Sequence, residues 1–394
     1  MSTIQTNAIV DASGGNTATV NGISPLANTT RFARNLVING AMQVAQRGTS
    51  STGTSYQTVD RMSVAFAGHD EAPTMTQADV ASGTSPYTSG FKKSMKIQNG
   101  NQTSGAGAAD ELALTYHFEG QDIAESGWNV ASASSNVTLS FWVKSSVTQQ
   151  FQTNVRLYGP ANGNQREFAF AYTLSANTWT KVTKTIPGHA SNTVRGDNAL
   201  GMFLQFPMFW GTNYTANARN HDTWEAKNNN QNMKDYPSTW WTTNDATWEI
   251  TGIQLEVGDT ATDFEHRSFG EEFAACQRYF YLMGSGTTFG SAQSGSGAYT
   301  RMYAQPARHP VAMRADPSFS FITGGSSYFV SGGGITVGTP TGDAGTVQNS
   351  VHTLYSLNTT KTGINRLSIG NGFSFNRGQS YGNTSDFIEV SAEL

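Results

Sequence analysis

Short stretches in which apolar and polar residues alternate, separated by turn-forming residues, dominate this chain. One stretch places Val137, Leu139, Phe141 and Val143 on one face of an extended strand and Trp142 on the opposite face. About ten such stretches follow one another between Gly, Asn, Ser and Pro residues, with no helical period between them. This pattern predicts an antiparallel sandwich or jelly roll. The strand candidates are 35–48, 57–68, 91–100, 111–120, 136–146, 151–160, 166–175, 178–188, 199–211 and 246–258.

The composition agrees with a folded β protein that has no nucleic-acid partner. Charged residues make up 13% of the chain, about half of the usual share of roughly 25%. Aromatic residues reach 11%, which is too many for a disordered chain. The net charge is −4 and no run of Lys and Arg occurs. Nucleic acid therefore has no basic surface to bind.

One helix interrupts the strand pattern near residue 270. Ser268 can cap its first turn, and Glu271 three residues later completes a capping box. Glycines at 284 and 286 end it. A single apolar stripe runs along it, and this stripe must be buried against neighbouring modules or against copies of the chain. The oligomer-interface candidates are the stripe residues Phe269, Phe273, Cys276 and Phe280.

These patterns predict an all-β chain of four parts. Residues 1–34 hold short alternating pieces with too little apolar surface for a core, and are expected to be an attachment or oligomerisation segment. Residues 35–262 form the jelly-roll β-sandwich, and 263–284 form a short helical linker. Residues 285–394 form a C-terminal β-sandwich domain, which is long enough for a core of its own.

No motif of catalysis or metal binding is present in the sequence. Phosphate-binding loops, the HEXXH metal motif and the G-x-S-x-G elbow are absent, and the seven histidines are scattered. Acidic clusters, such as Asp70 with Glu71 and Glu256 with Asp259 and Asp263, could serve glycoside hydrolysis, but a polar β surface always brings some carboxylates together. We predict no enzyme activity, no catalytic residue and no metal ligand.

The richest aromatic stretch lies between residues 203 and 252 and is full of Asn and Asp. Exposed indole rings beside amide side chains suit a sugar, which has flat apolar faces edged by hydroxyls. Alternatively, the long insertion folds over its own tryptophans as a small core. Calcium could be held by Asp and Asn here, but no EF-hand spacing occurs, so no cofactor is predicted. The glycan-binding candidates are Trp210, Tyr214, Trp224, Trp240 and Trp241.

The N-terminus lacks a signal peptide, and no apolar run reaches the ~18 residues that would span a bilayer. We therefore expect synthesis in the cytosol and no membrane insertion.

Four runs of residues, 34–48, 56–62, 248–280 and 309–321, together resemble a family of bacteriophage virion proteins, chiefly tail-fibre and receptor-binding proteins of marine and freshwater phages. "RNLVINGAMQVAQRG" (34–48) with "YQTVDRM" (56–62) is similar to the start of a carbohydrate-binding-module-like jelly roll in that family, with Met62 in place of its usual Trp. "WEITGIQLEVGDTATDFEHRSFGEEFAACQRYF" (248–280) looks like its end and is the most specific match. "HPVAMRADPSFSF" (309–321) resembles the start of the C-terminal β domain.

This resemblance implies a structural component of the phage virion, assembled in the host cytoplasm as a homotrimer. The N-terminus would attach to other tail or virion proteins, and the distal β domain would face a host-surface glycan. The resemblance implies no catalytic residues. A capsid decoration or tail adaptor protein with a purely structural role is the alternative, and a glycan-depolymerising tailspike is a weaker one.

Overall fold

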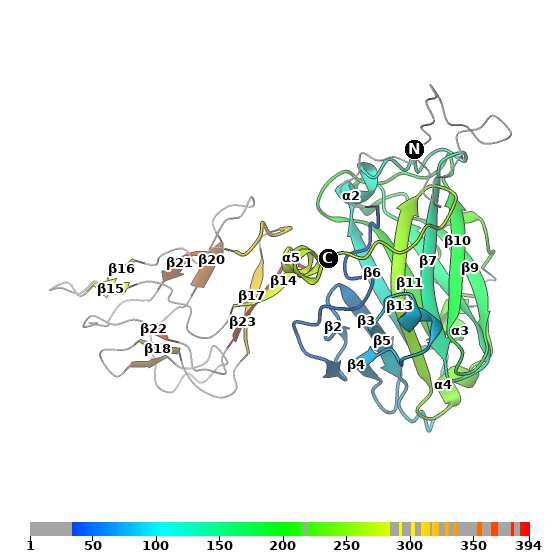
Figure 1. The fold of residues 1–394 in the computed structure, drawn as a ribbon, viewed down its shortest axis with the longest axis horizontal. Coiled ribbons are helices and arrows are strands. Elements are labelled where there is room, and N and C mark those ends of the chain that lie inside the picture. The colour runs from blue at the N-terminus through cyan, green and yellow to red at the C-terminus, as the bar shows by residue number, and fades with distance from the viewer. Residues whose placement is uncertain are drawn as a thin grey trace, which may run out of the picture. The chain divides into compact units, whose positions relative to one another are not determined.

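The computed structural model describes residues 34–215, 219–283, 291–293, 301–303, 309–315, 317–322, 328–330, 335–337, 353–356, 364–368, 380–381 and 387–394. The predicted attachment segment, 1–34, lies outside the described residues except for Arg34. The chain divides into two compact units (Figure 1). The first contains Met1–Ala41, Ala65–Pro73 and Ala78–His266, and the second contains Met42–Val64, Thr74–Gln77 and Arg267–Leu394.

Strands are the main elements, and the described helices are short. The helices are α1 (Ser85–Thr88), α2 (Gly120–Ala124), the 3-10 turn η1 (Pro160–Asn162), α3 (Thr212–Thr215), α4 (Thr239–Thr242) and α5 (Phe269–Gln277). The strands up to residue 257 are β1 (Ser50–Ser51), β2 (Ser55–Tyr56), β3 (Met62–Ala67), β4 (Thr74–Asp79), β5 (Lys93–Gln98), β6 (Glu111–Glu119), β7 (Asn136–Ser145), β8 (Gln149–Leu157), β9 (Arg166–Leu174), β10 (Thr180–Pro187), β11 (Leu200–Trp210), β12 (Trp224–Ala226) and β13 (Thr247–Val257). The later strands are β14 (Phe280–Met283), β15 (Ser291–Gln293), β16 (Arg301–Tyr303), β17 (Ser318–Ile322), β18 (Tyr328–Val330), β19 (Ile335–Val337), β20 (Thr353–Ser356), β21 (Ile364–Ser368), β22 (Ser380–Tyr381) and β23 (Phe387–Ser391).

The first unit is an antiparallel β-sandwich, which confirms the predicted fold class. One sheet contains the run β5-β13-β7-β10 and the other contains the run β12-β9-β8-β11-β6. Neighbouring strands pair antiparallel, as in β7 with β10 and β13, and in β11 with β6 and β8. Figure 1 shows these strands running lengthwise through the unit. Strands β3 and β4 each contribute residues to both units.

Aromatic and aliphatic side chains from the two sheets meet in the core of the sandwich. The ring centroid of Phe141 on β7 lies 5.2 Å from that of Phe206 on β11 and 5.6 Å from that of Tyr172 on β9. Phe206 also lies 6.0 Å from Trp248 on β13. The inward residues of β7 are fully buried, as their alternation predicts. Trp142 is therefore on the outer face of its sheet.

The first predicted strand, 35–48, is wrong, whereas the other candidates from 57 to 258 each contain a strand. Asn39 and Met42 have φ angles of 59° and 58°, which a strand does not allow. The segment instead lies along β13, where the Leu36 N–H donates to Leu255 O and the Ile253 N–H donates to Gly40 O. Local alternation alone could not distinguish this packing from a strand.

The long connection between β11 and β13 covers the outer face of the second sheet. The carbonyl oxygen of Asn232 accepts hydrogen bonds from Gln152 and Asn154 of β8, both 3.0 Å long. Farther along, the Trp240 N–H donates to Gln149 Oε1 over 2.9 Å. Gln149, Gln152 and Asn154 of β8 are buried, and these bonds with the connection satisfy their amide groups.

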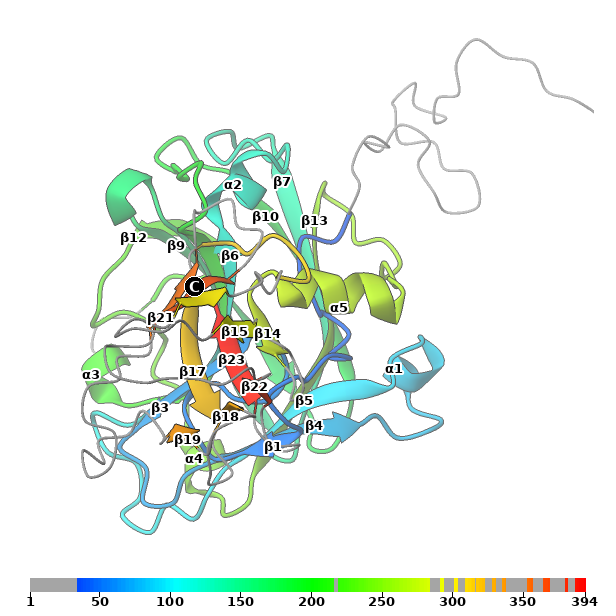
Figure 2. The same cartoon turned by 90° about the vertical axis from the view of Figure 1, so that its left-hand side faces the viewer.

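The second unit contains α5, whose predicted capping box is confirmed. The Ser268 hydroxyl accepts from the Glu271 N–H, and the Glu271 carboxylate accepts from the Ser268 N–H. The helix ends earlier than predicted, because Phe280 lies in β14 and not on the helix. Figure 2 shows β14, β23 and β17, which form one antiparallel sheet in that order.

Buried ion pairs hold residues 42–64 to the C-terminal end within the second unit. Arg61 Nη1 lies 2.5 Å from Glu393 Oε2, and Arg47 Nη1 lies 3.4 Å from Glu393 Oε1. The Gln46 side chain donates to the carbonyl oxygen of Phe280 over 2.8 Å. The predicted division at residues 35, 263 and 285 did not include this grouping, because partners so far apart in sequence leave no local signal.

Candidate functional site

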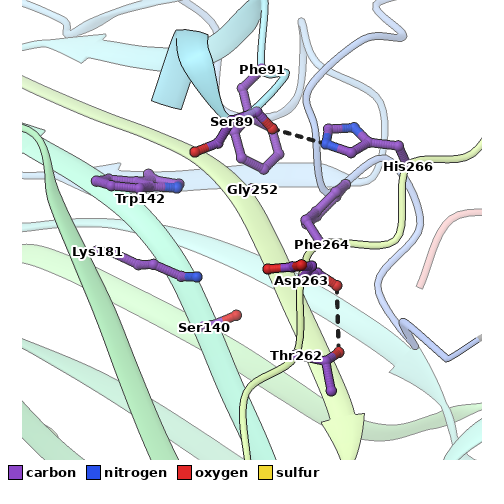
Figure 3. Close-up of a pocket in the computed structure, with 10 residues that line it drawn as sticks. All are labelled: Ser89, Phe91, Ser140, Trp142, Lys181, Gly252, Thr262, Asp263, Phe264 and His266. Carbon is purple, nitrogen blue, oxygen red and sulfur yellow. Dashed lines mark hydrogen bonds between the residues drawn. The ribbon is translucent and has the colours of Figure 1, made fainter. Parts of the chain in front are cut away.

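The outer face of the sheet β5-β13-β7-β10 carries a pocket of about 240 Å³ beside Trp142. Figure 3 shows Trp142 and Lys181 on one side of the pocket and Phe264 and His266 on the other. Trp142 is half-buried, so part of its indole ring is open to a ligand. The lining residues are Ser89, Phe91, Ser140, Trp142, Lys181, Gly252, Thr262, Asp263, Phe264 and His266.

Three rings pack together as the wall opposite Trp142. Phe91 lies 4.8 Å from Phe264 and 5.1 Å from His266 between ring centroids, and Phe264 lies 4.9 Å from His266. His266 Nε2 is 3.0 Å from the carbonyl oxygen of Ser89. Because a carbonyl oxygen only accepts, Nε2 carries the hydrogen in this contact. These contacts hold the three rings against one another in the absence of a ligand.

Gly252 forms the floor of the pocket at an irregularity in β13. The register between β13 and β7 shifts between Thr251 and Gln254. Gly252 has a φ angle of 65°, and a Cβ atom there would lie 2.6 Å from Phe91 Cζ. Only glycine fits both the backbone conformation and the close approach of the ring.

A buried carboxylate holds the loop after β13 in place. Glu256 accepts hydrogen bonds from the Thr262 N–H over 2.8 Å and from the Thr262 hydroxyl over 2.6 Å. The Gln254 side chain donates to Glu256 over 2.9 Å and accepts from the Glu265 N–H over 2.8 Å. These bonds position Asp263, Phe264 and His266 at the pocket.

Polar groups converge on the space beside the indole ring. Lys181 of β10 is directly opposite Trp142 in the register of the two strands. Figure 3 shows the Lys181 ammonium, the Asp263 carboxylate and the Ser140 hydroxyl directed to the same region. An ammonium donates hydrogen bonds, a carboxylate accepts them and a hydroxyl does both. Together with one aromatic face, they suit a small polyhydroxylated ring.

The aromatic residues that the sequence singled out lie elsewhere, and most are core residues. Trp240 and Trp241 are 0% and 1% exposed, and Trp210 and Trp224 are also buried. The indole N–H groups of Trp224, Trp240 and Trp241 donate to the carbonyl oxygens of Pro187, Thr247 and Gly105. Tyr214 is half-buried against Trp210, 6.2 Å away between centroids. These rings pack as a small core, which is the alternative interpretation of this stretch.

The signal in the sequence that lies at the pocket was Trp142, on the face of β7 opposite its apolar residues. No such signal in the sequence marked the other pocket residues Phe91, Asp263, Phe264 and His266. They come from connections far apart in the sequence, and the sandwich brings them together.

The apolar stripe of α5 is divided between surface and core. Phe269 is 57% exposed and stacks on half-buried Phe273 with ring centroids 5.8 Å apart. Cys276 and Phe280 are buried within the second unit. Burial raises the pKa of the Cys276 thiol well above its usual value. The stripe's role in an oligomer stays a prediction, and only its first residues reach the surface.

Several carboxylates of the acidic clusters considered for hydrolysis accept structural hydrogen bonds. Asp70 accepts from the N–H and hydroxyl of Ser104, and Asp110 accepts from the Gly107 N–H. Within the described residues, no group of three or more His, Cys, Asp or Glu side chains could hold a metal ion. No helix among the described residues is long and apolar enough to cross a membrane.

A second hollow, of about 690 Å³, lies along residues 225–231 and lacks an aromatic ring. Its wall includes Lys227, whose pKa burial lowers to about 8. Three consecutive asparagines, 228–230, supply most of its amides. It offers hydrogen bonds without an apolar platform, so the Trp142 pocket is the stronger candidate.

No protein-family model matches the chain, and no curated protein sequence matches it. Among solved structures it is similar to the enzymatically active domain of tailspike protein 4 from bacteriophage CBA120, with 11% identity, a TM-score of 0.30 and coverage of 57% of this chain and 22% of that one. A xylan-binding domain from Paenibacillus barcinonensis shows 12% identity, a TM-score of 0.25 and coverage of 55% and 100%. A family 11 carbohydrate-binding module from Clostridium thermocellum shows 11% identity, a TM-score of 0.26 and coverage of 55% and 98%. This chain thus spans about a fifth of the tailspike domain.

Proposed function

We propose that this protein binds glycans through the Trp142 pocket. The observation that carries this proposal is the half-buried indole ring of Trp142 facing an aromatic wall, with Lys181, Asp263 and Ser140 beside it. An apolar ring face stacks on the indole, while hydroxyl groups exchange hydrogen bonds with the polar side chains. A sugar ring uses both features within one pocket.

We further propose that the binding serves host recognition by a phage virion, as a homotrimeric tail fibre. The support is the resemblance of residues 34–48, 56–62 and 248–280 to phage receptor-binding proteins. In this proposal the protein binds the glycan without cleaving it. Among the described residues, Asp263 is the one carboxylate that lines the pocket, and the nearby Glu256 is occupied by Thr262 and Gln254, whereas glycoside hydrolysis uses a pair of carboxylates. A capsid decoration protein is the competing assignment.

The binding proposal predicts that Trp142→Ala lowers glycan affinity at least about tenfold, because it removes the stacking platform. Affinity would be measured on a glycan panel and then by calorimetry with the best binder. Tyr214→Ala is the matched control, since Tyr214 is a half-buried aromatic residue outside the pocket. Equal affinity of Trp142→Ala and the unaltered protein, with both folded, contradicts the proposal.

The virion assignment is tested separately by electron microscopy of intact phage particles labelled with antibody against residues 282–394. Label at the far end of a tail fibre supports host recognition. Label spread over the capsid supports the decoration protein instead.

A further inference from the structure

A second indole, Trp179, lies on the same outer sheet face as Trp142. Trp179 directly precedes β10, whose Lys181 pairs with Trp142 across the strands. Side chains alternate along a strand, so Trp179 and Lys181 face the same side. Lys144, two residues beyond Trp142 on β7, places its Nζ atom 5.0 Å from the centre of the Trp179 ring. Trp179 is half-buried, like Trp142.

The two tryptophans are diagonal neighbours on adjacent antiparallel strands. Diagonal pairs of this kind have Cα atoms about 7–8 Å apart. We take each indole face as the platform for one sugar ring. Two or more linked sugars can reach both rings, with Lys144 and Lys181 between them. The pocket thus continues into a strip, which we define by Trp142, Lys144, Trp179 and Lys181.

The charges along this strip favour an uncharged ligand. Lys144 is neutralised by Glu249, with Nζ 2.9 Å from Oε1. Lys181 has no carboxylate within 4.0 Å among the described residues, and the Asp263 carboxylate faces the same pocket. Sugar hydroxyls can accept from Lys181 and donate to Asp263 at once. An acidic group drawn to Lys181 would also meet Asp263, which repels it.

We infer that the strip binds an uncharged oligosaccharide chain, with consecutive sugars on Trp142 and Trp179, rather than a single terminal sugar. This inference rests on the proposed glycan binding and names the class of glycan. It predicts that affinity rises with the number of linked sugars in the glycan. Affinity should change little with salt concentration, because no charged ligand group is involved.

The test is a titration series with neutral gluco-, galacto-, manno- and xylo-oligosaccharides, from single sugars to hexasaccharides, and with oligogalacturonates as acidic probes. Tryptophan fluorescence and calorimetry report binding to the full chain. We expect affinity to rise about tenfold between the single sugar and the trisaccharide. Trp179→Ala should remove this rise while leaving the binding of the single sugar unchanged. Trp179→Phe, which keeps an aromatic ring, should retain most of it.

The outcomes test the strip, the charge of the ligand and the binding at Trp142 separately. An affinity that is independent of chain length, or unchanged by Trp179→Ala in a folded protein, overturns the strip but leaves binding at Trp142 intact. Preference for oligogalacturonates that weakens from about 50 mM to about 500 mM NaCl overturns the uncharged ligand. Binding of no probe, neutral or acidic, overturns the proposed function and the strip together.

Discussion

At the scale of single residues, the position of an aromatic ring on its strand decides what it can do. Trp142 and Phe141 are neighbours in sequence, yet Phe141 fills the core and Trp142 faces outward. The tryptophans of the 203–252 stretch are more numerous, but their burial leaves no ring face for a ligand in this structure. The local pattern of a strand thus predicted which ring stays accessible, which the density of aromatic residues did not.

Asp60 in the second unit should make stability depend on pH. Burial raises its pKa from 3.8 to about 6, against the lowering effect of hydrogen bonds from Gln46 and the charge of Arg47. The folded state therefore binds a proton more tightly than the unfolded state does. The resulting stabilisation is full below about pH 4 and is lost as pH rises through about 6, by up to about 3 kcal/mol.

The check is the free energy of unfolding by urea at a series of pH values, for the unaltered protein and for Asp60→Asn. The free energy of unfolding of the unaltered protein minus that of Asp60→Asn should fall as pH rises from about 4 to about 7. Parallel curves across that range would show that Asp60 has the same pKa in both states.

At the scale of elements, the irregularity in β13 builds the pocket. Sequence alternation predicted β13. It could not predict the register shift at Gly252 or the packing of the following loop, because both depend on Phe91 and on strands that pair from distant parts of the chain. The same limit applies to residues 35–48, whose alternation resembled a strand.

Replacing Gly252 by alanine should damage the pocket while leaving the sandwich folded. The φ angle of 65° and the contact with Phe91 both oppose a Cβ atom, and we expect a loss of about 1–2 kcal/mol in stability. Displacement of Phe91 should also weaken glycan binding. Thermal unfolding and titration of Gly252→Ala measure the two effects. Gly83→Ala is the control, because its φ is also positive but nothing lies within 4 Å of a Cβ there. Equal behaviour of the two variants would show that the Phe91 contact is unimportant.

At the scale of the whole molecule, the sequence predicted an all-β chain with a helix between β-rich regions. It did not predict that residues 42–64 belong with the C-terminal residues in one compact unit. That grouping depends on Arg47 and Arg61, each of which pairs with Glu393 more than 300 residues later in the chain. Periodicity describes residues that are close in sequence, so it cannot predict ion pairs between residues this far apart.

The predicted homotrimer can be tested at the exposed end of the helical stripe. Phe269→Ser should weaken self-association without unfolding the chain, because the Phe269 side chain is exposed and helix capping by Ser268 is unaffected. Light scattering measures the mass in solution. Cys276→Ser is the comparison, since it alters a buried residue and should lower stability more than assembly. An unchanged mass for Phe269→Ser would remove the stripe from the interface.

The most direct measurement of the central claim is a structure of the protein with the best-binding glycan of the panel. We expect a sugar ring stacked on Trp142, with hydroxyl groups within hydrogen-bond distance of Lys181 and Asp263. A glycan bound elsewhere, with the Trp142 pocket empty, would contradict it.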